Sequence, residues 1–76
     1  MAKTNGTTVE FGGAYGVWFA AGQRRDDQGA AFEGEDAYPA RDEDYDVPAP
    51  TLPEWLVAAL ERDGWSGPFI RGQEVL

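Results

Sequence analysis

The residues of this chain that could do chemistry are mainly carboxylates, and seven of them fall in the stretch 33–46. General acid–base catalysis needs two carboxyl groups at a fixed separation on a rigid scaffold, with one of them in an apolar pocket. A charged stretch interrupted by glycine and proline is expected to supply neither rigidity nor burial. We therefore predict no acid–base active site among the carboxylates, which are Glu33, Glu35, Asp36, Asp42, Glu43, Asp44 and Asp46.

Three of these acids, Asp42, Asp44 and Asp46, have the spacing of the first three ligands of a calcium-binding loop. Such a loop needs glycine at position six and glutamate at position twelve. Those positions hold Val47 and Pro53, so the EF-hand interpretation fails. The remaining alternatives are loose binding of Ca²⁺ or Mg²⁺ by exposed carboxylates and a solvated acidic loop, and we favour the loop.

Other catalytic chemistries lack the residues they require. The chain has no cysteine and no histidine, which excludes disulfides, a Cys/His zinc site and a histidine-activated nucleophile. Arg24 and Arg25 could bind a phosphate or carboxylate, but Asp26 and Asp27 follow directly and are expected to neutralise them. The sequence predicts neither an enzyme nor a protein with a cofactor.

The charge balance points to the kind of partner. The 76 residues carry a formal net charge of −8, which argues against direct binding to nucleic-acid phosphates. Most of the excess lies in residues 33–46, where like charge and few aliphatic side chains oppose collapse. We expect residues 22–50 to form an extended acidic arm or loop within a single small domain, 1–76. A short strand around residues 29–32 is compatible with this.

The elements expected on either side of this arm make a small α+β fold. Residues 7–20 predict an N-terminal β-hairpin, because residues 7–11 alternate with period two and Gly12-Gly13 suits a tight turn. A two-residue loop would pair Phe11 with Ala14, placing Val9, Phe11 and Trp18 on one face. Tyr15, Val17 and Phe19 would line the other face beside Thr8 and Glu10. That face is either left exposed or docked on a partner.

The C-terminal part predicts one α-helix over about 52–63. Thr51 and Glu54 have the spacing of a capping box, Gly64 suits the left-handed position after the helix, and Trp65 would then pack on Leu60. A short final strand over residues 69–71 is also compatible with the sequence.

A chain of this size without disulfides or zinc is expected to associate with a protein partner or with copies of itself. Tyr38 and Tyr45 lie within the acidic stretch, where they are either exposed or anchored in a partner. The hypothesis is that the acidic arm meets a basic protein surface. The expected partner-binding residues are Tyr15, Phe19, Tyr38, Asp42, Glu43, Asp44, Tyr45 and Asp46.

These features favour a non-enzymatic structural or assembly protein, such as a phage virion accessory or capsid-decoration protein. The alternative is an acidic inhibitor that mimics nucleic acid and blocks a DNA-binding host enzyme; a small antitoxin-like regulator is a third. No membrane span and no signal-peptide core are visible, so we expect a protein made and kept in the cytoplasm, or carried in a virion.

Overall fold

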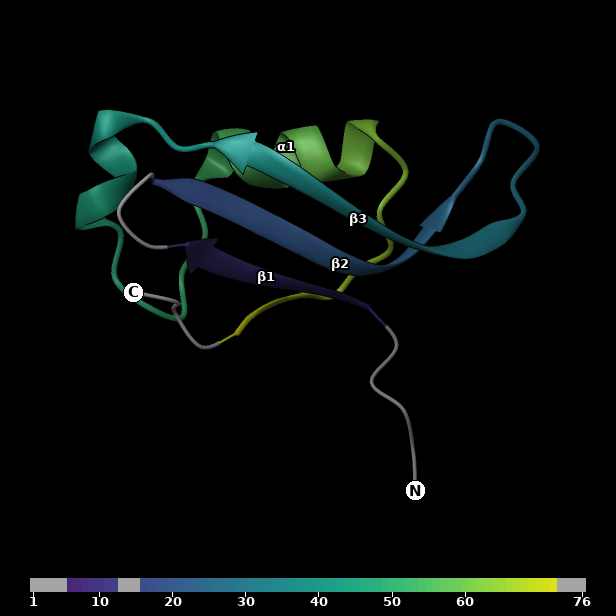
Figure 1. Cartoon of the computed structure of the whole chain (residues 1–76), viewed down its shortest axis with the longest axis horizontal. Helices are drawn as coiled ribbons and strands as arrows, with labels where there is room; N and C mark the ends of the chain where they lie inside the picture. Colours follow the sequence, from purple (N-terminus) through teal and green to yellow (C-terminus); the bar gives the residue numbers. More distant parts are fainter. Residues whose placement is uncertain (1–5, 13–15, 73–76) are drawn as a thin grey trace, which may run out of the picture.

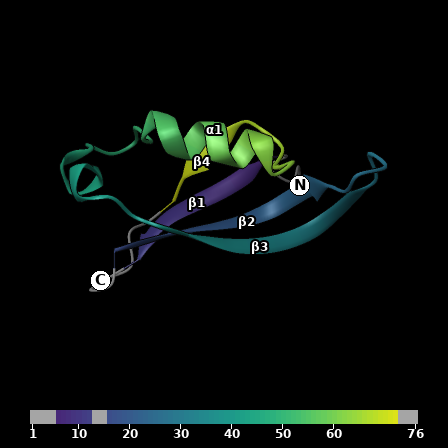
Figure 2. The same cartoon turned by 90° about the horizontal axis from the view of Figure 1, so that it is seen from above.

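A computed structural model describes residues 6–12 and 16–72 of the chain. Within these residues, four strands form one sheet in the order β3-β2-β1-β4, and a single α-helix packs on one side of it (Figure 1). Seen from above, α1 lies along one face of the curved sheet and leaves the other face uncovered (Figure 2). The small α+β architecture expected from the sequence is confirmed. The elements are β1 (Thr7–Gly12), β2 (Val17–Arg25), β3 (Ala31–Pro39), the 3₁₀ helix η1 (Asp42–Asp46), α1 (Glu54–Arg62) and β4 (Phe69–Arg71).

The N-terminal hairpin is present, but its predicted register is wrong. β1 and β2 are antiparallel with Phe11 opposite Trp18, four residues beyond the Ala14 that a two-residue loop would require. Because the shift is even, side chains keep their faces. Val9 and Trp18 are therefore buried on the helix side as expected, whereas Phe19 is exposed on the other side.

Residues 22–50 differ most from expectation, because most of them belong to regular structure instead of an arm or loop. β2 runs on to Arg25, and β3 pairs antiparallel with it over nine residues. In the turn between them, the Asp26 carboxylate accepts hydrogen bonds from the N–H groups of Gln28 and Ala30, both at 2.9 Å. Backbone pairing orders β3 without burying its carboxylates, and Glu33, Glu35 and Asp36 remain exposed.

One end of α1 agrees with the sequence and the other does not. The helix begins after Pro53 with no side-chain cap, so the predicted Thr51–Glu54 capping box is wrong. Thr51 instead closes a turn, its N–H donating to the Pro48 carbonyl at 2.8 Å. The C-terminal Schellman motif is confirmed: Trp65 N–H donates to the Leu60 carbonyl at 3.0 Å, and Gly64 has φ +88°.

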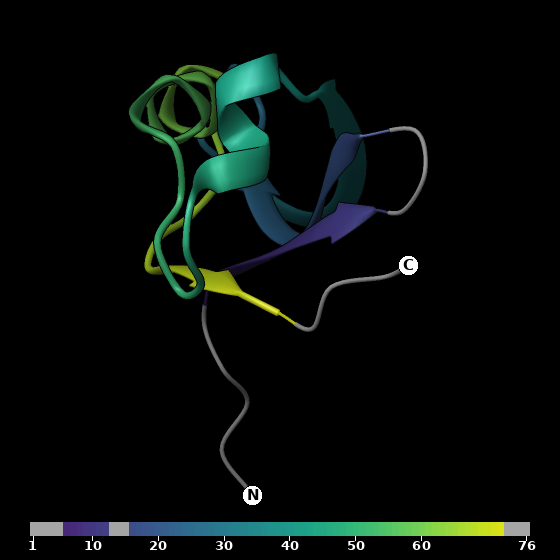
Figure 3. The ribbon, with the colours of Figure 1, turned by 90° about the vertical axis from the view of Figure 1, so that its left-hand side faces the viewer.

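The core lies between the sheet and α1. Leu56, Ala59 and Leu60 of the helix face Val9, Trp18 and Ala20 of the sheet, with Tyr38 and Trp65 completing the cluster. η1 lies on the same side of the sheet as α1 (Figure 3). β4, predicted as a possible final strand, pairs parallel with β1. Among the described residues no helix has the length and apolarity to cross a bilayer.

Candidate functional site

The sheet face opposite α1 is the candidate site, and we call it the open face. Side chains alternate across a strand, so the register fixes which residues lie there. Phe19 stands opposite Glu10 of β1 and Ala37 of β3, and Ala21 stands opposite Glu35. None of the described elements covers this side of the sheet (Figure 2). The open face consists of Thr8, Glu10, Val17, Phe19, Ala21, Gln23, Arg25, Ala31, Glu33, Glu35, Ala37 and Ile70.

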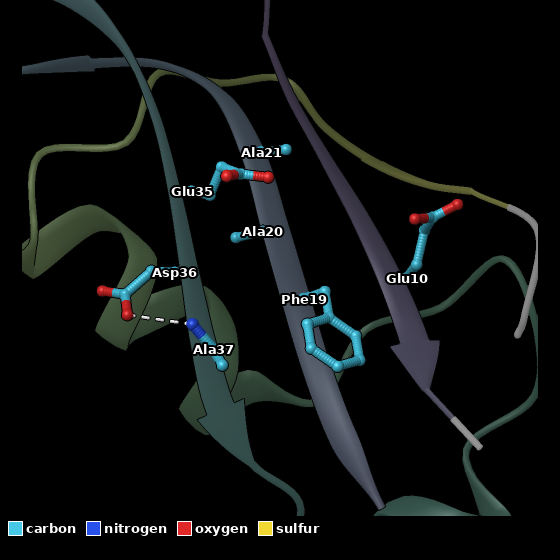
Figure 4. A pocket seen from close by; sticks show the side chains of 7 residues that line it. All are labelled: Glu10, Phe19, Ala20, Ala21, Glu35, Asp36 and Ala37. Carbon is cyan, nitrogen blue, oxygen red and sulfur yellow. Dashed lines mark hydrogen bonds between the residues drawn. The ribbon is translucent and has the colours of Figure 1, made fainter.

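Phe19 is the apolar centre of the open face. Its side chain is 45% exposed, and its ring lies across Gly12, where any Cβ would collide with it. The ring and neighbouring alanines form the floor of a shallow hollow of about 470 Å³. Figure 4 shows Glu10 from β1 on one side of Phe19 and Glu35 from β3 on the other. The hollow is therefore apolar in the middle and acidic at its margins.

Among the described residues, no cation forms an ion pair with a carboxylate of the open face. Glu33 and Glu35 stand opposite Gln23 and Ala21, and neither they nor Glu10 forms an ion pair with another described residue. Arg25, at the end of β2, donates instead to the Gly29 carbonyl at 2.9 Å. The field over this face is consequently negative and complements a basic surface.

Asp44, one of the expected partner-binding residues, is buried in η1 with 2% of its surface exposed. Its carboxylate accepts the indole N–H of Trp18 at 3.0 Å and that of Trp55 at 3.0 Å, and also the backbone N–H of Arg41 at 2.8 Å. Burial by itself would raise the pKa of Asp44. The hydrogen bonds from Arg41, Trp55 and Trp18 outweigh burial, so the pKa lies below its usual value.

Tyr38 is also internal, at 7% exposure. Its hydroxyl donates to Asp63 at 2.7 Å and accepts from the Trp65 indole at 3.0 Å. Burial, followed by the hydrogen bond to Asp63, raises the pKa of Tyr38 to about 12. The same hydrogen bond, with help from Arg62, lowers the pKa of Asp63. Each of the three indole N–H groups thus donates to an oxygen of η1 or of β3.

The structure therefore does not bring the expected partner-binding residues to one surface. Tyr38 and Asp44 hold the interior together and are inaccessible to a partner in this conformation. Tyr45 is 58% exposed, yet its ring stands edge-on to Phe11 with centroids 5.2 Å apart. Asp42, Glu43 and Asp46 are exposed on η1, on the helix side. Phe19 alone of the described members lies on the open face, and Tyr15 falls outside the described residues.

Sequence reasoning placed Glu10 on the face of Phe19, but it missed Ala21, Glu35 and Ala37 as neighbours of that ring. The signal was present as the alternation of residues 33, 35 and 37, which share a face only if 31–39 is a strand. The calcium-like spacing of residues 42–46 does not place three carboxylates on one surface, because the Asp44 side chain points into the interior. Within residues 6–12 and 16–72, no three potential metal ligands cluster.

Comparison with models of protein families, with curated proteins and with solved structures found no match.

Proposed function

We propose that this chain is a non-enzymatic protein-binding module that docks through its open face on a basic surface of a larger protein assembly. The observation that carries the proposal is the uncovered Phe19, set between carboxylates that form no ion pair with a described residue. A solvent-exposed aromatic ring is unfavourable in the free protein, and the free energy falls when a partner covers the ring.

The two parts of the open face would do different work in such a complex. The ring of Phe19 and the methyl groups of Ala21 and Ala37 supply apolar area at the centre, where binding energy concentrates. Glu10 and Glu35 at the margin speed encounter with a basic partner and fix its orientation. A virion accessory or capsid-decoration protein is one member of this class, and the size and composition of the chain support it.

A second candidate, imitation of nucleic-acid charge, gains support from one observation. A mimic must present its acids at fixed positions, and Glu33 and Glu35 lie on a paired strand. They repeat at a regular interval of about 6.6 Å on one face. Salt dependence separates the two candidates. A mimic loses its target steeply as ionic strength rises, whereas a partner held by Phe19 is retained.

The test is co-purification of the tagged full-length chain from its source cells, with mass spectrometry of the retained proteins at low and high salt. Three chains are compared: the native one, Phe19→Asp, and the control Glu61→Gln on the exposed side of α1. A partner that the native chain and the control retain, and that Phe19→Asp loses, supports docking through the open face. Equal recovery with all three chains contradicts it.

A further inference from the structure

β3 is an edge strand whose outer backbone is accessible. It occupies one end of the sheet order, and among the described strands it pairs with β2 alone. Of its nine residues, Gly34 is half-buried, Tyr38 is buried and the others are exposed. An exposed edge of this length offers unpaired N–H and C=O groups to another chain.

The hydrogen-bond pattern shows which groups face outward. Ala40 N–H donates to Gly16 carbonyl at 2.8 Å, and Asp26 N–H donates to Ala30 carbonyl at 3.0 Å. In an antiparallel pair, bonded and non-bonded positions alternate. Because bonded positions recur at every second residue between these two bonds, the even-numbered residues of β3 direct their backbone N–H and C=O groups toward β2. The odd-numbered residues, 31, 33, 35, 37 and 39, direct their backbone groups to the free edge.

At one end of this edge, the backbone offers no available N–H group to a partner. The Asp36 carboxylate accepts the N–H of Ala37 at 2.9 Å (Figure 4), and Pro39 has no N–H to offer. The accessible donors that remain belong to Ala31, Glu33 and Glu35. Two of these three residues carry carboxylates on the open face, and neither is in an ion pair among the described residues.

We propose that β3 accepts an added strand from a basic, extended segment of a partner protein, which pairs with Ala31, Glu33 and Glu35. Main-chain hydrogen bonds supply the affinity in such strand addition, and alternate side chains supply the specificity. Lysine or arginine at every second position of the partner segment would lie beside Glu33 and Glu35. The inference rests on the proposed function for the basic character of the partner.

A second copy of the chain fits this edge poorly. Antiparallel pairing of β3 with itself about residue 34 would place Glu33 directly opposite Glu35 of the other copy, twice. Like charges in directly opposed positions destabilise a sheet, and each copy carries a formal net charge of −8. Charge complementarity therefore selects a basic strand over self-association.

The probe is a synthetic peptide with alternating lysine and valine, seven residues long and blocked at both ends. Its control has the same sequence with N-methyl groups on the three central residues, which keeps the charge and abolishes strand pairing. Amide exchange of the full chain, followed by nuclear magnetic resonance, is measured with each peptide. We expect exchange at Ala31, Glu33 and Glu35 to slow at least about tenfold with the first peptide and to be unchanged with the control.

Two variants distinguish the contribution of the Glu35 backbone N–H to peptide binding from that of its charge. Glu35→Pro removes an outward N–H at an edge position that tolerates proline, and should abolish the protection. Glu35→Gln keeps that N–H and should weaken binding only a few-fold.

Equal effects of both peptides would overturn strand addition and leave charge-driven docking, and so the proposed function, intact. Absence of binding up to about 1 mM peptide would also overturn the inference, whereas the co-purification experiment tests the proposed function independently. A dimer of the free chain with the same amides protected would replace the basic partner with a second copy and overturn the proposal.

Discussion

Trp18 and Trp55 donate their indole N–H groups to the same carboxylate, that of Asp44. The first tryptophan belongs to the sheet and the second to α1, so the acid of η1 joins both layers of the fold. A residue of the acidic stretch thus acts as an internal support. The chain orders residues 42–46 with its own side chains, which the charge pattern alone did not suggest.

Replacing Asp44 should test this support. In Asp44→Asn, two indole donors compete for one amide oxygen, and the amide NH₂ faces groups that cannot accept from it. Leaving a buried donor unbonded costs about 1–3 kcal/mol, so we expect the free energy of unfolding to fall by about 2 kcal/mol. Urea titration followed by circular dichroism measures it. The exposed neighbour Asp42→Asn is the control and should change stability by less than about 0.5 kcal/mol; equal values for the two variants would contradict the role of Asp44.

Acid should weaken the fold in a defined pH range. The pKa values of Asp44 and Asp63 are lower in the folded chain than in the unfolded one, where aspartate titrates near 4. Their stabilising contribution is therefore complete above about pH 4 and is lost as pH falls through the lower, folded-state values. Urea unfolding at a series of pH values from 7 down to 2 should show this decline, and Asp44→Asn should show a shallower one. Identical slopes for both chains would refute the assignment to Asp44.

Gly64 should be intolerant of a side chain. Its φ is +88°, and a Cβ there would crowd the Arg25 carbonyl. The left-handed conformation alone costs an alanine about 1 kcal/mol, so we expect Gly64→Ala to lower stability by about 2 kcal/mol. Gly67→Ala is the matched control, since no atom lies within 4 Å of its Cβ position. Thermal unfolding of both variants is the measurement, and a similar loss in both would argue against the helix-end geometry.

Proline at adjacent positions of β3 should distinguish its two edges. Asp36→Pro removes an N–H that the alternation assigns to β2, and should cost at least about 2 kcal/mol of stability. Glu35→Pro removes an outward N–H and should cost much less. Asp36→Ala controls for loss of the carboxylate that binds Ala37 N–H. Chemical denaturation ranks the three variants, and the reverse order for the two prolines would show that the edge assignment is wrong.

Local signals in the sequence predicted the parts of the fold that depend on local chemistry. Gly64 followed by Trp65 was enough for the end of α1, because the Schellman motif involves only the last turn. The faces of Val9 and Trp18 followed from strand alternation, even though the register did not. β1, β2, β4 and α1 were therefore predictable in outline.

The rest depends on contacts between distant residues. β3 buries one side chain, Tyr38, so it lacks the apolar alternation that marks a strand, and its order comes from pairing with β2. The burial of Asp44 depends on donors from Trp18, Arg41 and Trp55, which come together only in the finished fold. For the same reason the open face was predicted from residues of β1 and β2 alone, without Glu33 and Glu35 of β3.

The parallel pairing of β4 with β1 has a consequence for how the molecule assembles. Thr7 of β1 donates its hydroxyl hydrogen to the Ser66 carbonyl across a separation of 59 residues. During synthesis on a ribosome, β1 can therefore pair with β4 only after nearly all of the described chain has been made. Long-range pairing of this kind slows folding, so the nascent chain must remain soluble in the interval, and its abundant negative charge favours that.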